Sequence, residues 1–322
     1  MRLLVLSIPA LLLSACGEPA TIDVADAPAA DITTDTTAEV SQPSTPTLAD
    51  IADPKLTVET IRPELDVLFG PGGNIGVLYG EEGALLVDDK FERNADEILA
   101  RVAARGGAAP VFVLNTHYHG DHTGSNAAMK AAGATIIAHE GVTDLMSRDI
   151  DNQLFGRTVE ARDPSALPQE TFAESLELDF AGQTLRLVHA PAAHTGGDLL
   201  VHFPDSDAIH MGDNFFNGMN PYIDIDAGGS LQGMIDAQKA GVDLAGPGTV
   251  VIPGHGPLTD REGLQASHDR LVRIRDLMQA RVDAGDTLDD VLAADIYAEI
   301  GVDDGFINNE NLARIAYRSL TE

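Results

Sequence analysis

One ten-residue segment limits what this chain can fold into more than any other. It reads Asn115-Thr116-His117-Tyr118-His119-Gly120-Asp121-His122-Thr123-Gly124 and follows the apolar run Val111 to Leu114, which predicts a buried strand. A strand end has no structural need for three imidazoles and a carboxylate within six residues. Because alternate residues of an extended segment point to the same side, His117 and His119 can face one way while Asp121 and His122 turn another. Nitrogen and oxygen ligands in this pattern suit two borderline metal ions such as zinc.

Short apolar runs separated by glycine-rich turns predict several antiparallel strands before this segment. The expected elements are strands at 65–69, 75–79 and 84–87, a helix over 94–105 and the strand at 111–114. The second half of the chain has a similar alternation of strands and helices. The expected elements there are strands at 171–178, 184–188, 199–203, 208–211 and 249–252, a helix over 230–244 and terminal helices over 260–284 and 288–300. Strands and helices in two similar halves predict a layered α/β sandwich.

Three later segments extend the pattern of His117 to His122. They are Pro191-Ala192-Ala193-His194-Thr195-Gly196-Gly197-Asp198, Met211-Gly212-Asp213 and Pro253-Gly254-His255-Gly256. With the H-x-H-x-D-H motif, these segments resemble the metallo-β-lactamase fold superfamily over residues 56 to 284. The resemblance implies a four-layer αββα sandwich that binds two zinc ions per chain. In it, His117, His119 and His194 would hold one metal and Asp121, His122 and His255 the other, with Asp213 and a hydroxide between them. A histidine at position 119 argues against the related di-iron oxygen reductases, which carry glutamate there.

The same resemblance implies a hydrolase in which the metal-bridging hydroxide attacks a carbonyl, with Asp121 orienting the hydroxide and relaying its proton. A lactone, ester, thioester or β-lactam would be the small-molecule substrate. The true β-lactamases of this fold usually have Cys or Ser where this chain has Asp213, which favours the other carbonyl substrates. Efficient β-lactam hydrolysis by a true metallo-β-lactamase is the alternative, and a non-catalytic zinc protein that binds a partner is a third reading.

Other polar residues are assigned less specific roles. His139, His189, His202, His210 and His268 lack ligand contexts, although His189 could support the loop that follows it. Asp88 ends a strand, where it could hold an imidazole tautomer or simply form a turn. Residues 149–168 and 214–222 are the two candidate loops over the metals, and their apolar side chains could equally pack into the core. No lysine or arginine that would bind a substrate carboxylate is evident beside Pro253 to Leu258.

The beginning of the chain predicts export. Arg2 and the apolar stretch from Leu3 to Leu13 form a signal-like segment, and Leu13-Ser14-Ala15-Cys16 resembles the lipobox of bacterial lipoproteins, so residues 1–16 are read as a lipoprotein signal peptide. Residues 17–54 have too few apolar side chains to fold and predict a disordered tether, followed by the metallo-β-lactamase fold domain with C-terminal helices at 55–322. We therefore expect a periplasmic protein anchored to the outer membrane only through a lipid on Cys16. A formal net charge of −31 disfavours nucleic acid as a partner, and the sequence carries no signal for an oligomeric state.

Overall fold

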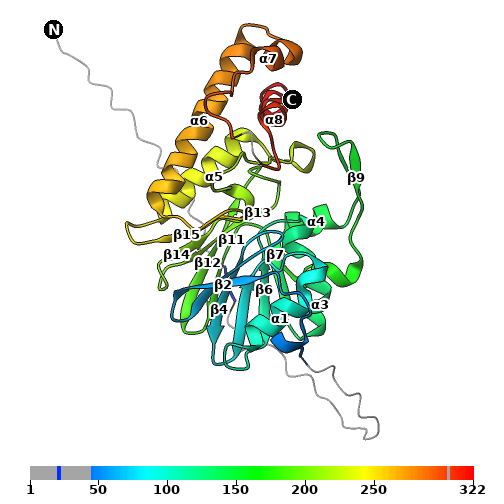
Figure 1. Cartoon of the computed structure of the whole chain (residues 1–322), viewed down its shortest axis with the longest axis vertical. Helices are drawn as coiled ribbons and strands as arrows, with labels where there is room; N and C mark the ends of the chain where they lie inside the picture. The colour runs from blue at the N-terminus through cyan, green and yellow to red at the C-terminus, as the bar shows by residue number, and fades with distance from the viewer. Residues whose placement is uncertain (1–19, 23–44, 303–304) are drawn as a thin grey trace, which may run out of the picture.

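The computed structural model describes residues 20–22, 45–302 and 305–322, and its centre is a pair of β-sheets (Figure 1). The seven-stranded sheet has the order β10-β7-β6-β5-β4-β3-β2, and the six-stranded sheet has the order β1-β11-β12-β13-β14-β15. The strands of the first sheet are β2 (Thr57–Arg62), β3 (Leu65–Phe69), β4 (Ile75–Gly80), β5 (Gly83–Val87), β6 (Pro110–Asn115), β7 (Thr135–His139) and β10 (Glu170–Phe172). Those of the second are β1 (Ala20–Ile22), β11 (Ser175–Phe180), β12 (Gln183–Ala190), β13 (Asp198–Phe203), β14 (Ala208–His210) and β15 (Val250–Ile252).

Helices α1 (Ala95–Ala103) and α3 (Asn126–Ala131) cover the outer face of one sheet, and α5 (Leu231–Leu244) and α6 (Arg261–Asp283) cover that of the other. The remaining helices are α2 (Gly120–Thr123), α4 (Glu140–Met146), α7 (Leu288–Ala294) and α8 (Asn309–Thr321). Leu85 and Leu114 of one sheet pack against Leu187 of the other in the core between the sheets. A second core lies between the seven-stranded sheet and α1 and α3, and a third lies between the six-stranded sheet and α5 and α6. These layers confirm the predicted four-layer αββα sandwich.

The pairing of the strands places the loops that matter for function at one edge. Strands β5, β6 and β7 run parallel, and β14 runs parallel to β15, so the carboxyl ends of these strands meet at the same end of the sandwich. The helices that follow start at side-chain caps: Ser230 accepts from the amide of Gly233 at α5, and Asp260 accepts from Gly263 at α6. The loops before these caps are thereby held close to the strand ends.

Two sequence predictions were wrong in their boundaries. Residues 171–178 do not form one strand, because the chain pairs with β7 through β10, crosses to the other sheet at 173–174, and then pairs with β12 through β11. The apolar pattern is the same on both sides of the crossing and does not mark it. The helix expected over 288–300 ends at Ala294, since Asp295 adopts a left-handed conformation with φ of 44°. Helix α8 was not predicted at all.

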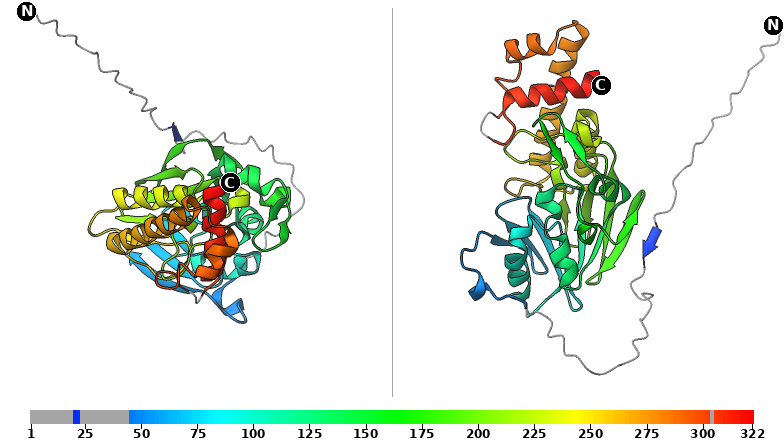
Figure 2. Two further views of the ribbon diagram at one scale, coloured as in Figure 1. Left: turned by 90° about the horizontal axis from the view of Figure 1, so that it is seen from above. Right: turned by 90° about the vertical axis from the view of Figure 1, so that its right-hand side faces the viewer.

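The C-terminal helices and a small hairpin rise above the end of the sandwich where the strand ends meet (Figures 1 and 2). The hairpin consists of β8 (Ile150–Asn152) and β9 (Arg157–Val159), which pair only with each other. In the described part of the chain, no helix has both the length and the apolar character needed to cross a bilayer. The predicted signal peptide at 1–16 lies outside the described residues. Most of the predicted tether at 17–54 also lies outside the described residues. Its described parts are residues 20–22, which form β1, and residues 45–54, which include a short 3₁₀ turn at Leu48–Asp50.

Candidate metal centre

All seven residues expected to bind metal come together at the carboxyl ends of the strands. The segment from His117 to His122 directly follows β6, and its last residues form the short helix α2. His194 lies in the loop between β12 and β13, Asp213 lies in a 3₁₀ turn after β14, and His255 follows β15. Both sheets therefore contribute to one cluster, and its side chains form two adjoining groups.

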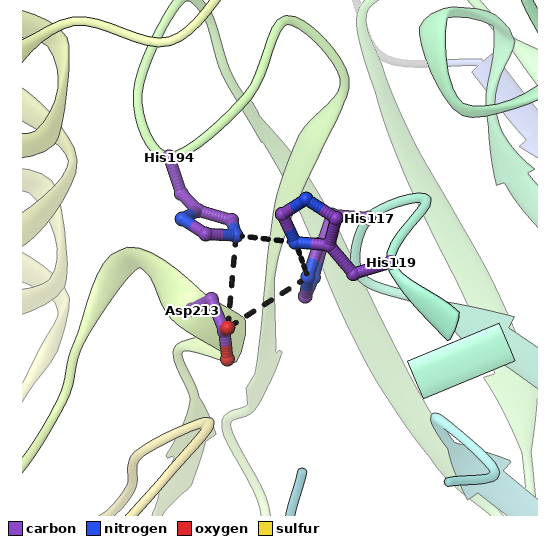
Figure 3. A group of neighbouring side chains, drawn as sticks. All are labelled: His117, His119, His194 and Asp213. Carbon is purple, nitrogen blue, oxygen red and sulfur yellow. Dashed lines mark hydrogen bonds and ion pairs between the residues drawn. The ribbon is translucent and has the colours of Figure 1, made fainter. Parts of the chain in front are cut away.

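The first group contains His117, His119, His194 and Asp213, whose side chains point toward a common centre (Figure 3). Nδ1 of His119 lies 3.1 Å from Nε2 of His117 and 2.9 Å from Nε2 of His194. Oδ2 of Asp213 lies 3.8 Å from Nε2 of His117 and 3.6 Å from Nε2 of His194. Three nitrogens and one oxygen thus surround one point.

The second group contains Asp121, His122 and His255. Nε2 of His255 lies 3.2 Å from Oδ2 of Asp121 and 3.4 Å from Nε2 of His122. Asp213 also reaches this group, because its Oδ1 lies 3.1 Å from Nε2 of His122 and its Oδ2 lies 3.4 Å from Nε2 of His255. The carboxylate of Asp213 therefore stands between the two groups.

The donor set fits metal ions of the size and preference of zinc. Ligands about 2.0–2.1 Å from a tetrahedral metal lie about 3.3 Å from one another, which is within the range of the separations in both groups. Oδ1 of Asp213 is buried and accepts no hydrogen bond from the described residues, which would be costly unless a cation is bound beside it. His119, Asp121 and His255 keep 17–24% of their side chains exposed, whereas the others are nearly closed to solvent, so the cluster opens on one side.

The electrostatics of the cluster favour metal ligation over protonation at some of the histidines. Burial lowers the pKa of His194 to about 4 and, together with the neighbouring His122, lowers the pKa of His117 well below its usual value. These two imidazoles are thus neutral near pH 7, with lone pairs free for a cation. Burial acts against protonation of His255 too, but the carboxylates of Asp213 and Asp121 together outweigh it and raise the pKa of His255 to about 9. In the absence of metal, protons on this side of the cluster offset the charge of the carboxylates.

Asp88 contacts a histidine of the cluster, which agrees with one of the two roles that the sequence suggested for it. Its Oδ2 lies 2.7 Å from Nδ1 of His122, and it also accepts from the amide and hydroxyl of Thr116 at 2.7 and 2.8 Å. This contact keeps the proton on Nδ1 and leaves Nε2 of His122 free to face the cluster. Asp88 has a positive φ of 67°, a strained conformation for a residue with a side chain.

Sequence reasoning missed a second supporting carboxylate, Asp224. Its Oδ2 lies 3.0 Å from Nε2 of His119 and accepts from the hydroxyl of Tyr118 at 2.7 Å. The contact fixes Nδ1 of His119 as the atom that faces the cluster. The carbonyl of Tyr222 similarly accepts from Nδ1 of His194 at 2.8 Å. The sequence around it, Ile223-Asp224-Ile225-Asp226, carries no signal for this role.

Sequence reasoning also missed Gly73, which packs closely on His122, and Lys90, which contacts Gly73. A Cβ atom added to Gly73 would lie only 2.0 Å from the His122 ring, so only glycine leaves room for the imidazole here. The fully buried Lys90 donates from Nζ to the carbonyl of Gly73. Burial lowers the pKa of Lys90 to about 8, against the attraction of Asp121 and Asp88. This lysine places a cation behind the carboxylates and fixes the glycine.

The remaining candidate residues divide between the cluster and the core. Phe215 is buried in the core below α5 and α6, whereas the ring of Phe216 stacks on His255 at 5.4 Å with an interplanar angle of 6°. His189 stacks on His139 at 3.7 Å and accepts or donates only to the backbone of Asp198, so it lies outside the cluster. The other histidines not expected to bind metal, which are His202, His210 and His268, are also absent from both groups.

Comparisons with known proteins bear on this arrangement. The sequence model of the metallo-β-lactamase superfamily matches residues 69–269. The chain is 30% identical over 124 residues to a hydroxyacylglutathione hydrolase of Synechococcus sp. (strain JA-3-3Ab), covering 38% of this chain and 42% of that protein. It is 23% identical over 168 residues to the 2,4-dinitroanisole O-demethylase subunit alpha of Nocardioides sp. (strain JS1661), covering 52% of this chain and 48% of that protein. The chain thus spans about half the length of these curated relatives.

Solved structures share the fold. A metallo-β-lactamase from Pontibacter korlensis superimposes with a TM-score of 0.56 at 19% identity, covering 67% of this chain and 99% of that one. The stereoselective inverting sec-alkylsulfatase Pisa1 from Pseudomonas sp. superimposes with a TM-score of 0.60 at 16% identity, covering 82% of this chain and 50% of that one. At such identities the likeness concerns the fold alone. Together with the family match over most of the folded part, it shows that the chain belongs to the metallo-β-lactamase superfamily.

Proposed function

We propose that this protein is a dinuclear zinc hydrolase that cleaves an ester, thioester or lactone. The observation that carries the proposal is the position of Asp213, whose two oxygens lie within 3.1–3.8 Å of ligand atoms in both groups. His117, His119 and His194 would hold one zinc ion, and Asp121, His122 and His255 the other. Two such ions, when bound, lower the pKa of a water molecule toward neutrality and polarise a substrate carbonyl.

The residues of the chain would then handle the proton. Hydrolysis forms a bond between the water oxygen and the carbonyl carbon, breaks the bond to the alcohol or thiol, and moves one proton from water to that leaving group. Asp121 is suited to this transfer because it is partly exposed at the open side of the cluster. Its neighbours His122 and His255 lower its pKa against the effect of burial, so it is ionised and accepts a hydrogen bond. Asp88 and Asp224 would keep the ligand imidazoles in the required tautomers.

The preference for alcohol and thiol leaving groups rests on Asp213 and on the relatives. A carboxylate between the metals adds negative charge where an anionic amide nitrogen would otherwise be stabilised, and alcohols and thiols need less of that stabilisation. Several curated relatives are hydroxyacylglutathione hydrolases, enzymes named for a thioester substrate. Location belongs to the same proposal: a lipid on Cys16 would place the enzyme in the periplasm at the outer membrane.

Steady-state kinetics on a panel of lactones, aryl esters, thioesters, penicillins, cephalosporins and carbapenems tests the proposal. We expect turnover of at least one lactone, ester or thioester, and β-lactam hydrolysis below a kcat/KM of about 10⁴ M⁻¹s⁻¹. Asp121→Asn should abolish most of the turnover while metal binding through His122 and His255 is retained in part. Efficient hydrolysis of β-lactams with inert esters would contradict the proposal and favour a true metallo-β-lactamase. No turnover of any carbonyl substrate by the zinc-loaded protein would favour a binding protein.

A further inference from the structure

An aromatic wall runs from the metal centre to the surface. We use this name for the rings of Tyr222, Phe155 and Phe306. The ring of Tyr222 lies 5.6 Å from the rings of both His119 and His194, and the Phe155 ring lies 5.5 Å from Tyr222. Phe306 continues the wall, with its ring 5.2 Å from Phe155 and 6.0 Å from Tyr222. Direct ring contacts therefore connect two proposed metal ligands with the outside of the molecule.

The outer end of the wall is unusually exposed for an aromatic side chain. Phe306 is 63% exposed, and only two other large apolar side chains, Leu48 and Val58, are exposed among residues 45–302 and 305–322. Tyr222 is buried and Phe155 is partly buried. An apolar surface of this kind next to a polar centre marks a place where an apolar group from another molecule can be buried.

Three separate parts of the chain build the wall, and polar contacts fix them in place. Asp226 accepts from both the amide and the side chain of Gln153, at 2.8 and 2.9 Å, in the turn of the β8–β9 hairpin. Arg318 of α8 donates to the same carboxylate at 2.8 Å. The side chain of Asn152 donates to the hydroxyl of Tyr222. The hairpin, the loop at 214–222 with the turn after it, and the C-terminal segment are thus tied together.

We propose that the aromatic wall binds the apolar group of the substrate while its carbonyl lies at the metal centre. We assign the wall to the substrate because it begins at His119, on the open side of the cluster. A substrate whose carbonyl lies at the metal centre would therefore extend along the rings. Beside the wall, Asp226 is paired with Arg318, and the guanidinium of Arg157 lies 5.5 Å over the Phe155 ring, so the wall offers rings and no free carboxylate to a cationic group. Medium-chain acyl or aromatic esters and thioesters fit this surface better than short or cationic ones. The inference rests on the proposed function and names the substrate class for it.

Chain-length dependence tests the inference directly. With p-nitrophenyl acetate, butyrate and octanoate, kcat/KM of the wild-type protein should rise by up to about fourfold for each methylene that the wall buries. Phe306→Ala should flatten this dependence by lowering kcat/KM with octanoate more than with acetate. Val58→Ala removes a similarly exposed apolar side chain on the edge strand β2 and should keep the wild-type dependence. A flat series in the wild-type protein, or an unchanged slope in Phe306→Ala, would overturn the inference.

A binding measurement separates this inference from the proposed function. The chain contains no tryptophan, so Phe306→Trp introduces a single reporter on the wall and Val58→Trp introduces a matched reporter away from it. Octanoate added to the zinc-loaded protein should shift the emission of Trp in the first variant to shorter wavelength in a saturable way, whereas acetate should not, and the second variant should show no shift with either. The outcomes separate the two proposals. If no ester is cleaved but octanoate binds, only the proposed function fails. If esters are cleaved and octanoate leaves the emission unchanged, the wall has another role. A dimer in light scattering that Phe306→Ala converts to a monomer would assign the wall to contact between copies and overturn the inference.

Discussion

Replacing Asp88 with Asn should weaken one metal site and spare the other. Asp88 is fully buried, and its Oδ2 contacts Nδ1 of His122 at 2.7 Å while Thr116 donates to both carboxylate oxygens. In Asp88→Asn, the amide oxygen keeps the backbone contact with Thr116, so the new NH₂ group faces His122 and donates to Nδ1. That contact moves the imidazole proton to Nε2, the atom that faces the cluster. Loss of such an outer contact costs about 10- to 100-fold in metal affinity, or about 1.4–2.7 kcal/mol.

The assay is a zinc titration of chelator-treated protein against a chromophoric competitor. We expect the zinc affinity of one of the two binding steps to fall by this factor in Asp88→Asn. The affinity of the other step should stay within about twofold. Asp224→Asn should do the opposite, because Asp224 supports His119 in the first group. Asp179→Asn, on an exposed strand position, is the control for a lost acid. Equal weakening of both steps in Asp88→Asn, or no change in either, would refute the reasoning.

Three further perturbations test other parts of the account. Gly73→Ala should lower zinc affinity by more than about tenfold, since a Cβ would lie 2.0 Å from the His122 ring, whereas in Gly246→Ala the new Cβ would meet only a threonine hydroxyl at 3.6 Å and the titration should not change. In metal-free protein, the raised pKa of His255, about 9, means that its ion pairing stabilises the fold below its unfolded pKa of about 6.5 and is lost as the pH rises through about 9. The melting temperature should therefore fall between about pH 6.5 and about pH 9. An equally steep fall in His255→Gln would show that another group is responsible. Cys16→Ser should release the protein from the membrane fraction, and a wild-type protein with an unmodified amino terminus in the soluble fraction would contradict lipidation.

Much of the fold and the cluster could be predicted because the relevant signals are local. Strand β6 is a continuous apolar run, and three histidines follow it within six residues, so both the element and the chemistry are read from one stretch. Asp213 and His255 follow strands β14 and β15, whose parallel pairing carries them to the same edge. Patterning combined with family resemblance was sufficient for these residues.

What could not be predicted depends on contacts between distant segments. Asp224 lies 105 residues from His119, and nothing near it in the chain marks it as a partner of an imidazole. The crossing at 173–174 between the sheets has the same apolar pattern on both sides, so only tertiary pairing reveals it. Phe306 lies in a segment without regular periodicity, and its approach to Tyr222 follows from the packing of α8 against the rest of the chain.

The central claim is that Asp213 joins two metal sites in one centre. Elemental analysis of protein purified without chelator, in the wild type and in Asp213→Ala, measures this most directly. The account predicts about two zinc equivalents per wild-type chain and a clear loss in the variant, because a carboxylate that contacts both groups is removed. One equivalent or none in the wild type, with no gain when zinc is added, would contradict it.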